Sequence, residues 1–502
     1  MLETLSASFS LFLSWANIVA IVIGTVIGVV VGAIPGLTGT MAVALALPFT
    51  FYLEPTTAIL FLVGIYKGSI YGGSIPAILI NTPGTPSASC TVLDGYPLAK
   101  KGQGGKALSM ALYASCVADV ISNVALVFFT ASIAELALKF GPPEFFTLIC
   151  FSLTVIAMVA GDSMIKGLLA ACLGLLMATA GMDLVYGTNR FVFGITEMLS
   201  GLAFIPIMIG LFAVPEILVN IRKQQGPVEV MDVKEKDWTT WEDFKRCFRT
   251  IVRGSLIGVV LGAIPGIGGT PAAFMSYGEA KRASKHPERF GKGELEGVAA
   301  AESGNNGVCG AAMIPLLSLG VPGDVIAGII LGAFMFHGLT PGPLLFQENL
   351  VFVYAIYIGI MLCSIVLLVV GWGAIKTFGG ISRIPKKILF PILIATCFFG
   401  TYAVNTQIFD ILVMVVASIV GYIMILLKIP PAPLVIAFIL GPMFEDNLRR
   451  SMVLSDGSLS IFLRSPICWL FLALTVLTLI IIARRTYRGM KGKYVGVPLN
   501  EG

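Results

Sequence analysis

The chain has 502 residues, of which 57% are hydrophobic and only 12% are charged, and its formal net charge is +5. Soluble globular domains carry about 25% charged residues, so a chain of this length with half that share cannot cover itself with a water-compatible surface. A soluble enzyme of ordinary build, a disordered chain and a nucleic-acid binder are therefore excluded, and the composition predicts an all-α polytopic membrane protein.

Uncharged segments begin near the N-terminus. Residues Thr4–Leu53 contain no charged side chain, which leaves room for two crossings, and no basic region marks them as a cleaved signal peptide. Further uncharged runs follow at Phe145–Gly161, Gly167–Met182, Met198–Pro215, Asn349–Ile375, Ile388–Phe409, Ile411–Leu427, Ile429–Phe444 and Ser465–Ala483. At the usual length of about 20 residues per crossing, we predict roughly 12 to 14 membrane segments. The 56 glycines and 27 prolines predict that several helices are discontinuous or re-entrant.

An internal repeat divides the chain. VGAIPGLTGT at 31–40 matches LGAIPGIGGT at 261–270, and SIPAILINTPGT at 74–85 aligns with MIPLLSLGVPGD at 313–324. Because two blocks recur in the same order, we predict two related halves. The predicted division is a first transmembrane repeat at 1–220, a cytoplasmic linker at 221–253, a second transmembrane repeat at 254–465, and a final span with a basic cytoplasmic tail at 466–502.

A ladder of glycines extends from the first block of each half toward the N-terminus. Its members are spaced by four residues at Gly24, Gly28, Gly32 and Gly36, and again at Gly254, Gly258, Gly262 and Gly266. Small residues at this spacing allow two membrane helices to approach closely, so the ladders predict close helix packing.

Equivalent loops of the two halves carry opposite charge. Residues 48–57 have no lysine or arginine, whereas the equivalent loop of the second half has five, among them Lys281 and Arg289. After the second block the pattern reverses, with Lys100 and Lys101 in the first half and no lysine or arginine at 333–348. Since basic loops mark the cytoplasmic side, we predict an inverted-topology repeat. The N-terminus is expected to be periplasmic, and the linker and the C-terminus cytoplasmic.

Four Pro-Gly breaks in apolar segments are the candidate sites. Broken helices expose N–H groups that attract anions, while freed carbonyls can coordinate cations. An isolated lysine in an apolar segment and a pair of asparagines near the second pair of breaks add polar groups. The predicted substrate-binding residues are Asn81, Thr82, Pro83, Gly84, Thr85, Ser87, Lys67, Asn305, Asn306, Gly320, Pro322 and Gly323. The predicted cation-binding residues are Gly36, Thr38, Gly39, Gly266, Gly269 and Thr270.

Each of these assignments has a structural alternative. The breaks can be plain turns between two spans, and the asparagines can tie two helices together. Lys67 can reach the membrane interface or form a structural pair with an acid such as Asp119.

Catalytic chemistry is not predicted. The nine cysteines are scattered without a CxxC pair, the two histidines, His286 and His337, have no ligand partners nearby, and no Walker A motif is present. No catalytic residue, transition-metal site or organic cofactor is therefore expected, and the chain is not expected to be an enzyme.

Three long stretches, at 71–108, 262–307 and 314–343, resemble the large membrane subunit of tripartite tricarboxylate transporters, the TctA family. The resemblance implies a bacterial inner-membrane protein that works with a small TctB-like membrane subunit and a TctC-like periplasmic solute-binding protein. It also implies cation-driven uptake of di- or tricarboxylates, with Na⁺ or H⁺ as the coupling ion. The alternatives are a carboxylate carrier or exporter that needs no binding protein, and a membrane scaffold or sensor that does not transport.

Overall fold

Helices make up nearly all of the computed structural model, which describes residues 2–159, 163–183, 187–222, 231, 237–381 and 386–494. The remainder of the predicted linker (223–230 and 232–236), the loop at 382–385 and the last eight residues of the predicted tail lie outside the described residues. Two two-residue strands, β1 (Gly181–Met182) and β2 (Asn189–Arg190), pair antiparallel. The prediction of an all-α polytopic membrane protein is confirmed, with this small hairpin as its one addition in the described ranges.

The helices of the first half are α1 (Leu2–Phe12), α2 (Trp15–Ala33), α3 (Gly39–Thr50), α4 (Pro55–Gly72), α5 (Ser74–Ile80), α6 (Ser89–Lys100), α7 (Gly104–Ala137), α8 (Pro142–Val159), α9 (Met164–Ala178), η1 (Thr196–Ser200), α10 (Phe204–Met208), the π-helical turn η2 (Ile209–Ala213) and α11 (Val214–Arg222). Those of the second half are α12 (Trp241–Gly262), α13 (Gly269–Ala283), η3 (Pro287–Arg289), α14 (Leu295–Ala311), α15 (Met313–Leu319), α16 (Val325–Phe336), α17 (Pro343–Glu348), α18 (Leu350–Ile381), α19 (Lys386–Asn405), α20 (Ile408–Leu426), α21 (Pro431–Leu454), η4 (Leu459–Leu463) and α22 (Pro466–Tyr494).

Seven segments of the described part are long and apolar enough to cross a membrane. They are Trp15–Ala33, Pro55–Ile80, Gly104–Ala137, Phe204–Arg222, Leu350–Thr377, Lys387–Asn405 and Ile408–Leu426. Five more apolar helices are shorter than a full crossing, among them α3 and α16. Short helices of this kind fit a membrane protein only where their ends are buried in protein or line a cavity.

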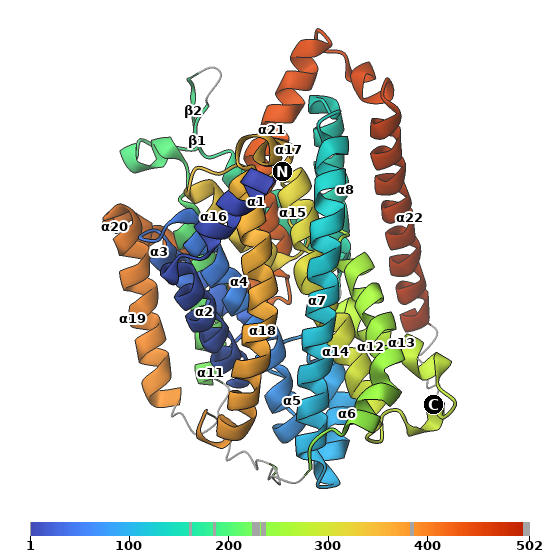
Figure 1. Cartoon of the computed structure of the whole chain (residues 1–502). Coiled ribbons are helices and arrows are strands. Elements are labelled where there is room, and N and C mark those ends of the chain that lie inside the picture. Colours follow the sequence, from blue (N-terminus) through green and yellow to red (C-terminus); the bar gives the residue numbers. More distant parts are fainter. Residues whose placement is uncertain are drawn as a thin grey trace, which may run out of the picture.

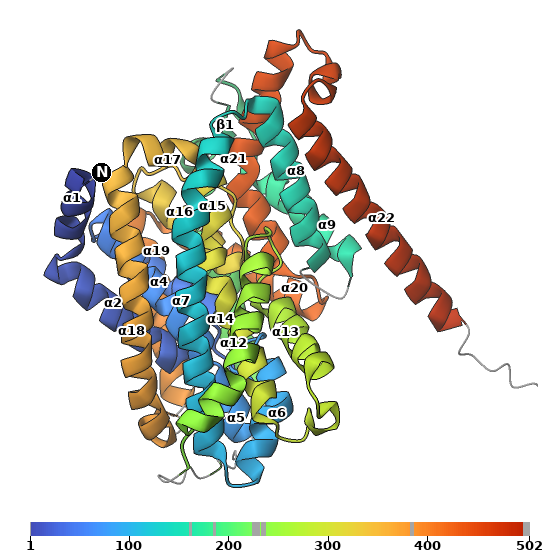
Figure 2. The same cartoon turned by 45° about the vertical axis from the view of Figure 1, so that its right-hand side comes forward.

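The two halves pack into each other rather than side by side. Helix α18 packs on α2 and α4, and helix α7 packs on α12 and α14. The second-half helix α21 packs on the first-half helices α8 and α9, and α20 packs on η2 and α11. Figure 1 shows the long helices α7 and α18 crossing the centre of the molecule, with α19 and α20 at one edge and α22 at the other. Figure 2 shows α22 leaning away from the bundle.

The glycine ladders bring helix backbones into direct contact, as predicted. A Cβ atom on Gly28 would lie 2.3 Å from the carbonyl oxygen of Ile65, and one on Gly258 would lie 2.6 Å from that of Gly304. The first contact joins α2 to α4 and the second joins α12 to α14. Only glycine leaves room for such an approach.

We expect Gly28→Ala to lower the free energy of unfolding by about 1–3 kcal/mol, because the added methyl group meets backbone atoms that cannot turn aside. Thermal unfolding of the purified protein in detergent measures the effect. Gly278→Ala is the matched control, since Gly278 lies in α13 with no atom within 4 Å of an added Cβ. That variant should keep or slightly raise the stability, because alanine favours helix by about 1 kcal/mol over glycine. Equal stabilities of the two variants would contradict the close contact.

The first half of α12 occupies residues that the sequence assigned to the linker. The side chain of Thr240 accepts from the N–H of Asp243, and Asp243 accepts in return from the N–H of Thr240, which forms a capping box. Lys106 adds an ion pair to Asp243 at 2.8 Å. Burial raises the pKa of Asp243, but the hydrogen bonds from Lys106 and Thr240 outweigh it and hold the pKa below its ordinary value. The predicted boundary at 253 therefore falls inside a continuous helix.

Candidate functional site

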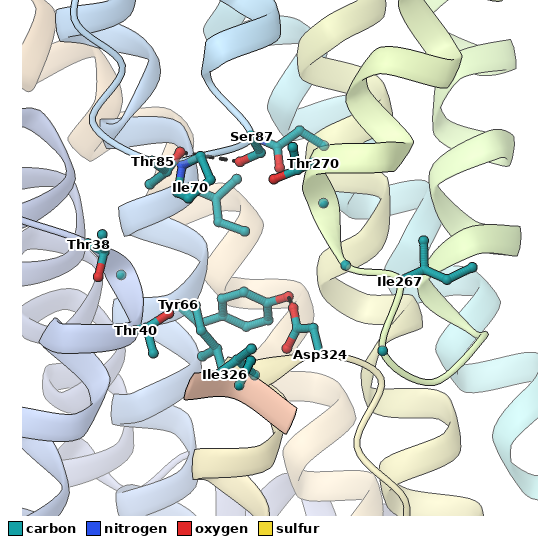
Figure 3. A pocket seen from close by; sticks show the side chains of 18 of the residues that line it. Thr38, Thr40, Tyr66, Ile70, Thr85, Ser87, Ile267, Thr270, Asp324 and Ile326 are labelled. Carbon is teal, nitrogen blue, oxygen red and sulfur yellow. Dashed lines mark hydrogen bonds between the residues drawn. The ribbon is translucent and has the colours of Figure 1, made fainter. Parts of the chain in front are cut away.

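A cavity of about 530 Å³ lies where the Pro-Gly breaks of the two halves meet. Figure 3 shows side chains from several separate segments around it, with Thr38 and Thr40 opposite Ile267 and Thr270. Within the described part of the chain no lysine or arginine lines this space. Its size falls in the range of about 300–1,000 Å³ that is typical of small-molecule sites.

Three helices begin at the wall of this cavity. The side chain of Thr38 caps α3 by accepting from the N–H of Met41, and Asp324 caps α16 by accepting from the N–H of Ala327 at 2.7 Å. Gly268, with a φ of +67°, precedes α13 and supplies no capping side chain. The first N–H groups of a helix have no partner within the helix and carry partial positive charge. Three helix N-termini thus direct partial positive charge toward the cavity, which also contains the carboxyl group of Asp324.

Two neighbouring hydroxyl groups and one amide add hydrogen-bonding capacity. Thr85 and Ser87 are both buried, with their hydroxyl oxygens 3.3 Å apart. Asn305 is only 1% exposed, and neither its Oδ1 nor its Nδ2 has a hydrogen-bond partner among the described residues. Its Oδ1 would lie 2.5 Å from a Cβ on Gly269, beside the start of α13. Buried polar atoms are usually hydrogen-bonded in proteins, so this amide is available to a polar ligand in the cavity.

Tyr66 and Asp324 join the two halves across the cavity. The hydroxyl of Tyr66 on α4 donates to Asp324 Oδ2 at the start of α16 (Figure 3). The sequence placed Asp324 in the last Pro-Gly break without naming it as a binding residue, and it did not point to Tyr66, Thr40 or Ser69, which also line the cavity. Asp324 directly follows the last Pro-Gly break, and this position could have identified it as a site residue.

The turns that follow α5 and α15 contain most of the predicted substrate residues, and these residues determine the shape of the turns. Asn81 and Gly320 end α5 and α15 in the left-handed conformation, with φ of 56° and 71°. The N–H of Gly84 donates to Gly73 O at 3.0 Å, and the N–H of Gly323 donates to Ala312 O at 3.2 Å. The matching geometry supports the alignment of the two blocks. Seven residues that were predicted to bind substrate lie in these turns and do not line the cavity. They are Asn81, Thr82, Pro83, Gly84, Gly320, Pro322 and Gly323.

Lys67 is paired away from the cavity lining. Its Nζ lies 2.8 Å from Asp119 Oδ2, and both side chains are 1% exposed. The same Nζ donates to Asn123 Oδ1 at 3.0 Å and to the carbonyl of Ile360 at 3.1 Å. All hydrogens of the ammonium group are thereby used, which corresponds to the structural alternative and does not support direct contact with a substrate.

Asn306 differs from its neighbour Asn305. Its Nδ2 donates to Ser115 on α7 at 2.8 Å and to the carbonyl of Glu302 at 3.1 Å. Glu302 is fully buried and accepts from the hydroxyls of Ser74, Thr91 and Ser115 on α5, α6 and α7. This cluster ties α14 to the first half, so Asn306 connects helices and does not line the cavity.

The residues predicted to bind a cation lie in the same place as those predicted to bind substrate. Thr38, Gly39, Gly266, Gly269 and Thr270 line the cavity together with Thr85, Ser87 and Asn305. Gly36 instead lines a neighbouring pocket.

Comparison with known proteins decides the family. The model described as the tripartite tricarboxylate transporter TctA family matches residues 18–436. The chain belongs to this family. A 52.8 kDa protein of Agrobacterium vitis, from the TAR-I ttuC′ 3′ region, is 37% identical over 497 residues and covers 98% of each chain. A second protein of that organism, from the TAR-II ttuC′ 3′ region, is 36% identical over 224 residues, which are 45% of this chain and 93% of the relative. No solved structure matches the chain.

Membership of the TctA family makes the chain a multi-pass membrane subunit of a transporter system with further subunits. The matched residues include all four Pro-Gly breaks and the whole cavity. The family is one of transporters, in agreement with the expectation that the chain is not an enzyme.

Proposed function

We propose that the chain is the large transmembrane subunit of a binding-protein-dependent secondary transporter that imports di- or tricarboxylates with a cation, Na⁺ in preference to H⁺, across the bacterial inner membrane. The observation that carries this proposal is the cavity of about 530 Å³ bordered by the starts of α3, α13 and α16. Helix N-termini and hydroxyl groups stabilise carboxylates without a buried basic side chain.

The repeat supplies two matched anion-binding ends. Thr40 and Thr270 are equivalent positions of the two 10-residue blocks, and both line the cavity. Each stands in the first turn of a short helix, where N–H groups are unpaired within the helix. A dicarboxylate placed between α3 and α13 would therefore present one carboxylate to each N-terminus, with Asn305 as a hydrogen-bond partner beside α13.

Contacts between loops support an inverted arrangement of the halves. Lys101, which follows α6, donates to the carbonyl of Lys292, which follows α13. Phe51, which follows α3, packs on Phe336 at the end of α16 with ring centroids 5.0 Å apart. The loops that meet are thus non-equivalent in the repeat, as two opposed halves require. In Figures 1 and 2, α5 and α6 lie near the lower end and their counterparts α15 and α16 in the upper part.

The same contacts support the proposed orientation. Lys100 and Lys101 end and follow α6, which lies near the lower end in Figures 1 and 2, and Lys101 contacts Lys292 beyond α13. The positive-inside rule assigns this basic end to the cytoplasm. Helix α1 lies near the upper end (Figure 1), so the N-terminus is placed in the periplasm, where the solute-binding protein would deliver the carboxylate. The small membrane subunit is proposed as the other partner.

Uptake into proteoliposomes tests the proposal. The chain is reconstituted with its small membrane subunit and binding protein, and labelled citrate, tartrate and succinate are offered with an imposed Na⁺ or H⁺ gradient. We expect accumulation of at least one of these acids, with loss of accumulation when the cation gradient is dissipated.

Any other result would indicate a different function for the chain. Uptake that is unchanged without a cation gradient would contradict coupling. Uptake that is unchanged without the binding protein would indicate an independent carrier. Binding without uptake of any of the three acids would indicate a scaffold or sensor.

A further inference from the structure

A second pocket of about 370 Å³ adjoins the cavity behind the first Pro-Gly break. Gly36, Thr38 and Thr40 form one wall, and Glu216 and Asn220 on α11 form part of the other. Thr38 and Thr40 also line the main cavity, so the two spaces share a wall that consists of the start of α3.

Glu216 is a carboxylate inside an apolar candidate span, Phe204–Arg222. The hydroxyl of Thr38 donates to its Oε2 at 2.8 Å. None of the ion pairs found among the described residues includes Glu216. An ionised carboxylate in such surroundings is expensive unless a positive charge accompanies it, and acidic groups within membrane segments commonly mark ion pathways.

Three residues with neutral oxygen atoms, Gly36, Thr38 and Asn220, line the same pocket as this carboxylate. The Nδ2 of Asn220 donates to the carbonyl of Gly36 at 2.5 Å, and the Oδ1 of Asn220 faces the same glycine. Gly36 has a φ of +94°, and a Cβ there would lie 2.1 Å from Asn220 Oδ1. The residues that line the pocket of Glu216 thus also offer the carbonyl of Gly36, which accepts from Asn220, the amide oxygen of Asn220 and the Thr38 hydroxyl. Hard cations prefer oxygen ligands of this kind.

Two features of α11 distinguish this pocket from an ordinary contact between helices. The π-helical turn η2 directly precedes α11, and such turns occur frequently at functional sites. Pro215, Asn220 and Arg222 recur with the same spacing as Pro442, Asn447 and Arg449 in the second half. Glu216 has no counterpart in that comparison, because Met443 stands there. An acid therefore stands at this position in only one of the two segments.

We propose that Glu216, Thr38, Asn220 and the carbonyl of Gly36 form a binding site for Na⁺. The inference rests on the proposed function, because it assigns the coupling ion to this pocket. Na⁺ fits better than a proton, since a proton needs the carboxylate alone, whereas the pocket offers several further oxygens and free volume. Thr38 links the two sites: it is both a neighbour of Glu216 and the N-cap of α3, whose first N–H groups border the cavity. Ion binding fixes that N-terminus for the carboxylate.

Binding of radioactive Na⁺ to the purified full-length chain in nanodiscs, with no carboxylate present, tests the site. We expect Glu216→Gln to weaken Na⁺ binding at least tenfold, and Thr38→Val and Asn220→Ala to weaken it as well. Glu216→Asp, which keeps the charge, should retain part of the affinity. Glu135→Gln removes an exposed carboxylate of α7 and should bind Na⁺ like the wild type. Melting temperatures in Na⁺-free choline buffer show whether each variant is folded.

Wild-type Na⁺ affinity in Glu216→Gln would overturn the site. Absence of Na⁺ binding in the wild type, together with loss of uptake in Glu216→Gln, would also overturn it and would indicate a proton at Glu216. If Glu216→Gln does not fold, Thr38→Val and Asn220→Ala decide the question by the same criterion. Carboxylate uptake is measured separately. Na⁺ binding that depends on Glu216 without any carboxylate uptake would refute the proposed function alone, whereas uptake with Na⁺ binding independent of Glu216 would refute this inference alone.

Discussion

Replacement of Lys67 by methionine is expected to lower the free energy of unfolding by about 3–5 kcal/mol, because it leaves Asp119 charged, buried and without its partner. The ammonium group contacts Asp119 Oδ2 at 2.8 Å, and Asp119 also accepts from the hydroxyl of Ser364 at 2.5 Å. The cluster joins α4 and α7 to α18, so its loss should loosen the packing of both halves. Thermal unfolding in detergent measures the change.

A double variant separates a structural pair from a substrate contact. Lys67→Met combined with Asp119→Leu should regain most of the stability, because apolar residues often replace a buried ion pair at little cost. Lys139→Met, in an exposed position after α7, is the control and should leave stability unchanged. A stable Lys67→Met single variant that fails to bind carboxylate would contradict this assignment and return Lys67 to the substrate site.

Replacement of Asn305 by alanine is expected to raise the carboxylate concentration for half-maximal uptake by about 10- to 150-fold, which corresponds to the about 1.5–3 kcal/mol of a hydrogen bond to a charged group. Both amide atoms lack partners among the described residues, so the same variant should be as stable as the wild type or slightly more stable. Uptake kinetics and melting temperatures on the same preparation measure the two effects.

Ser318→Ala is the matched control for Asn305→Ala. Ser318 is equally buried, donates to the carbonyl of Ile314 within α15, and does not line the cavity. Its removal should leave the uptake kinetics unchanged. A variant Asn305→Ala that unfolds at lower temperature and transports with wild-type affinity would show that the amide has a structural role only.

The features that depend on neighbouring residues were predictable from the sequence. The ladder at Gly24, Gly28 and Gly32 predicted a close approach because spacing by four places these residues on one helix face. The Pro-Gly breaks predicted interrupted helices because proline lacks an N–H and glycine permits left-handed turns. Both predictions are confirmed by the contacts of α2 with α4 and by the turns after α5 and α15.

The pair of Lys67 with Asp119 was among the alternatives that the sequence suggested, but other features that depend on distant residues were not predictable. Asn305 and Asn306 are adjacent, but their side chains leave a helix about 100° apart, and only the packing of α7 decides that Asn306 is buried against it. Tyr66 meets Asp324 from 258 positions away, and Thr38 meets Glu216 from 178 positions away. A single sequence contains no measure of such distances. Glu216 also ended an uncharged run and looked like the edge of a span.

The carboxylate is proposed to bind in the cavity between the starts of α3 and α13. A cryo-EM map of the chain with saturating concentrations of a transported carboxylate would show where the acid binds. We expect density for the acid between Thr40 and Thr270, within hydrogen-bond distance of Asn305. Density at another place, such as the separate cavity of about 350 Å³ beside Asp183 and Arg449, with the central cavity empty, would contradict it.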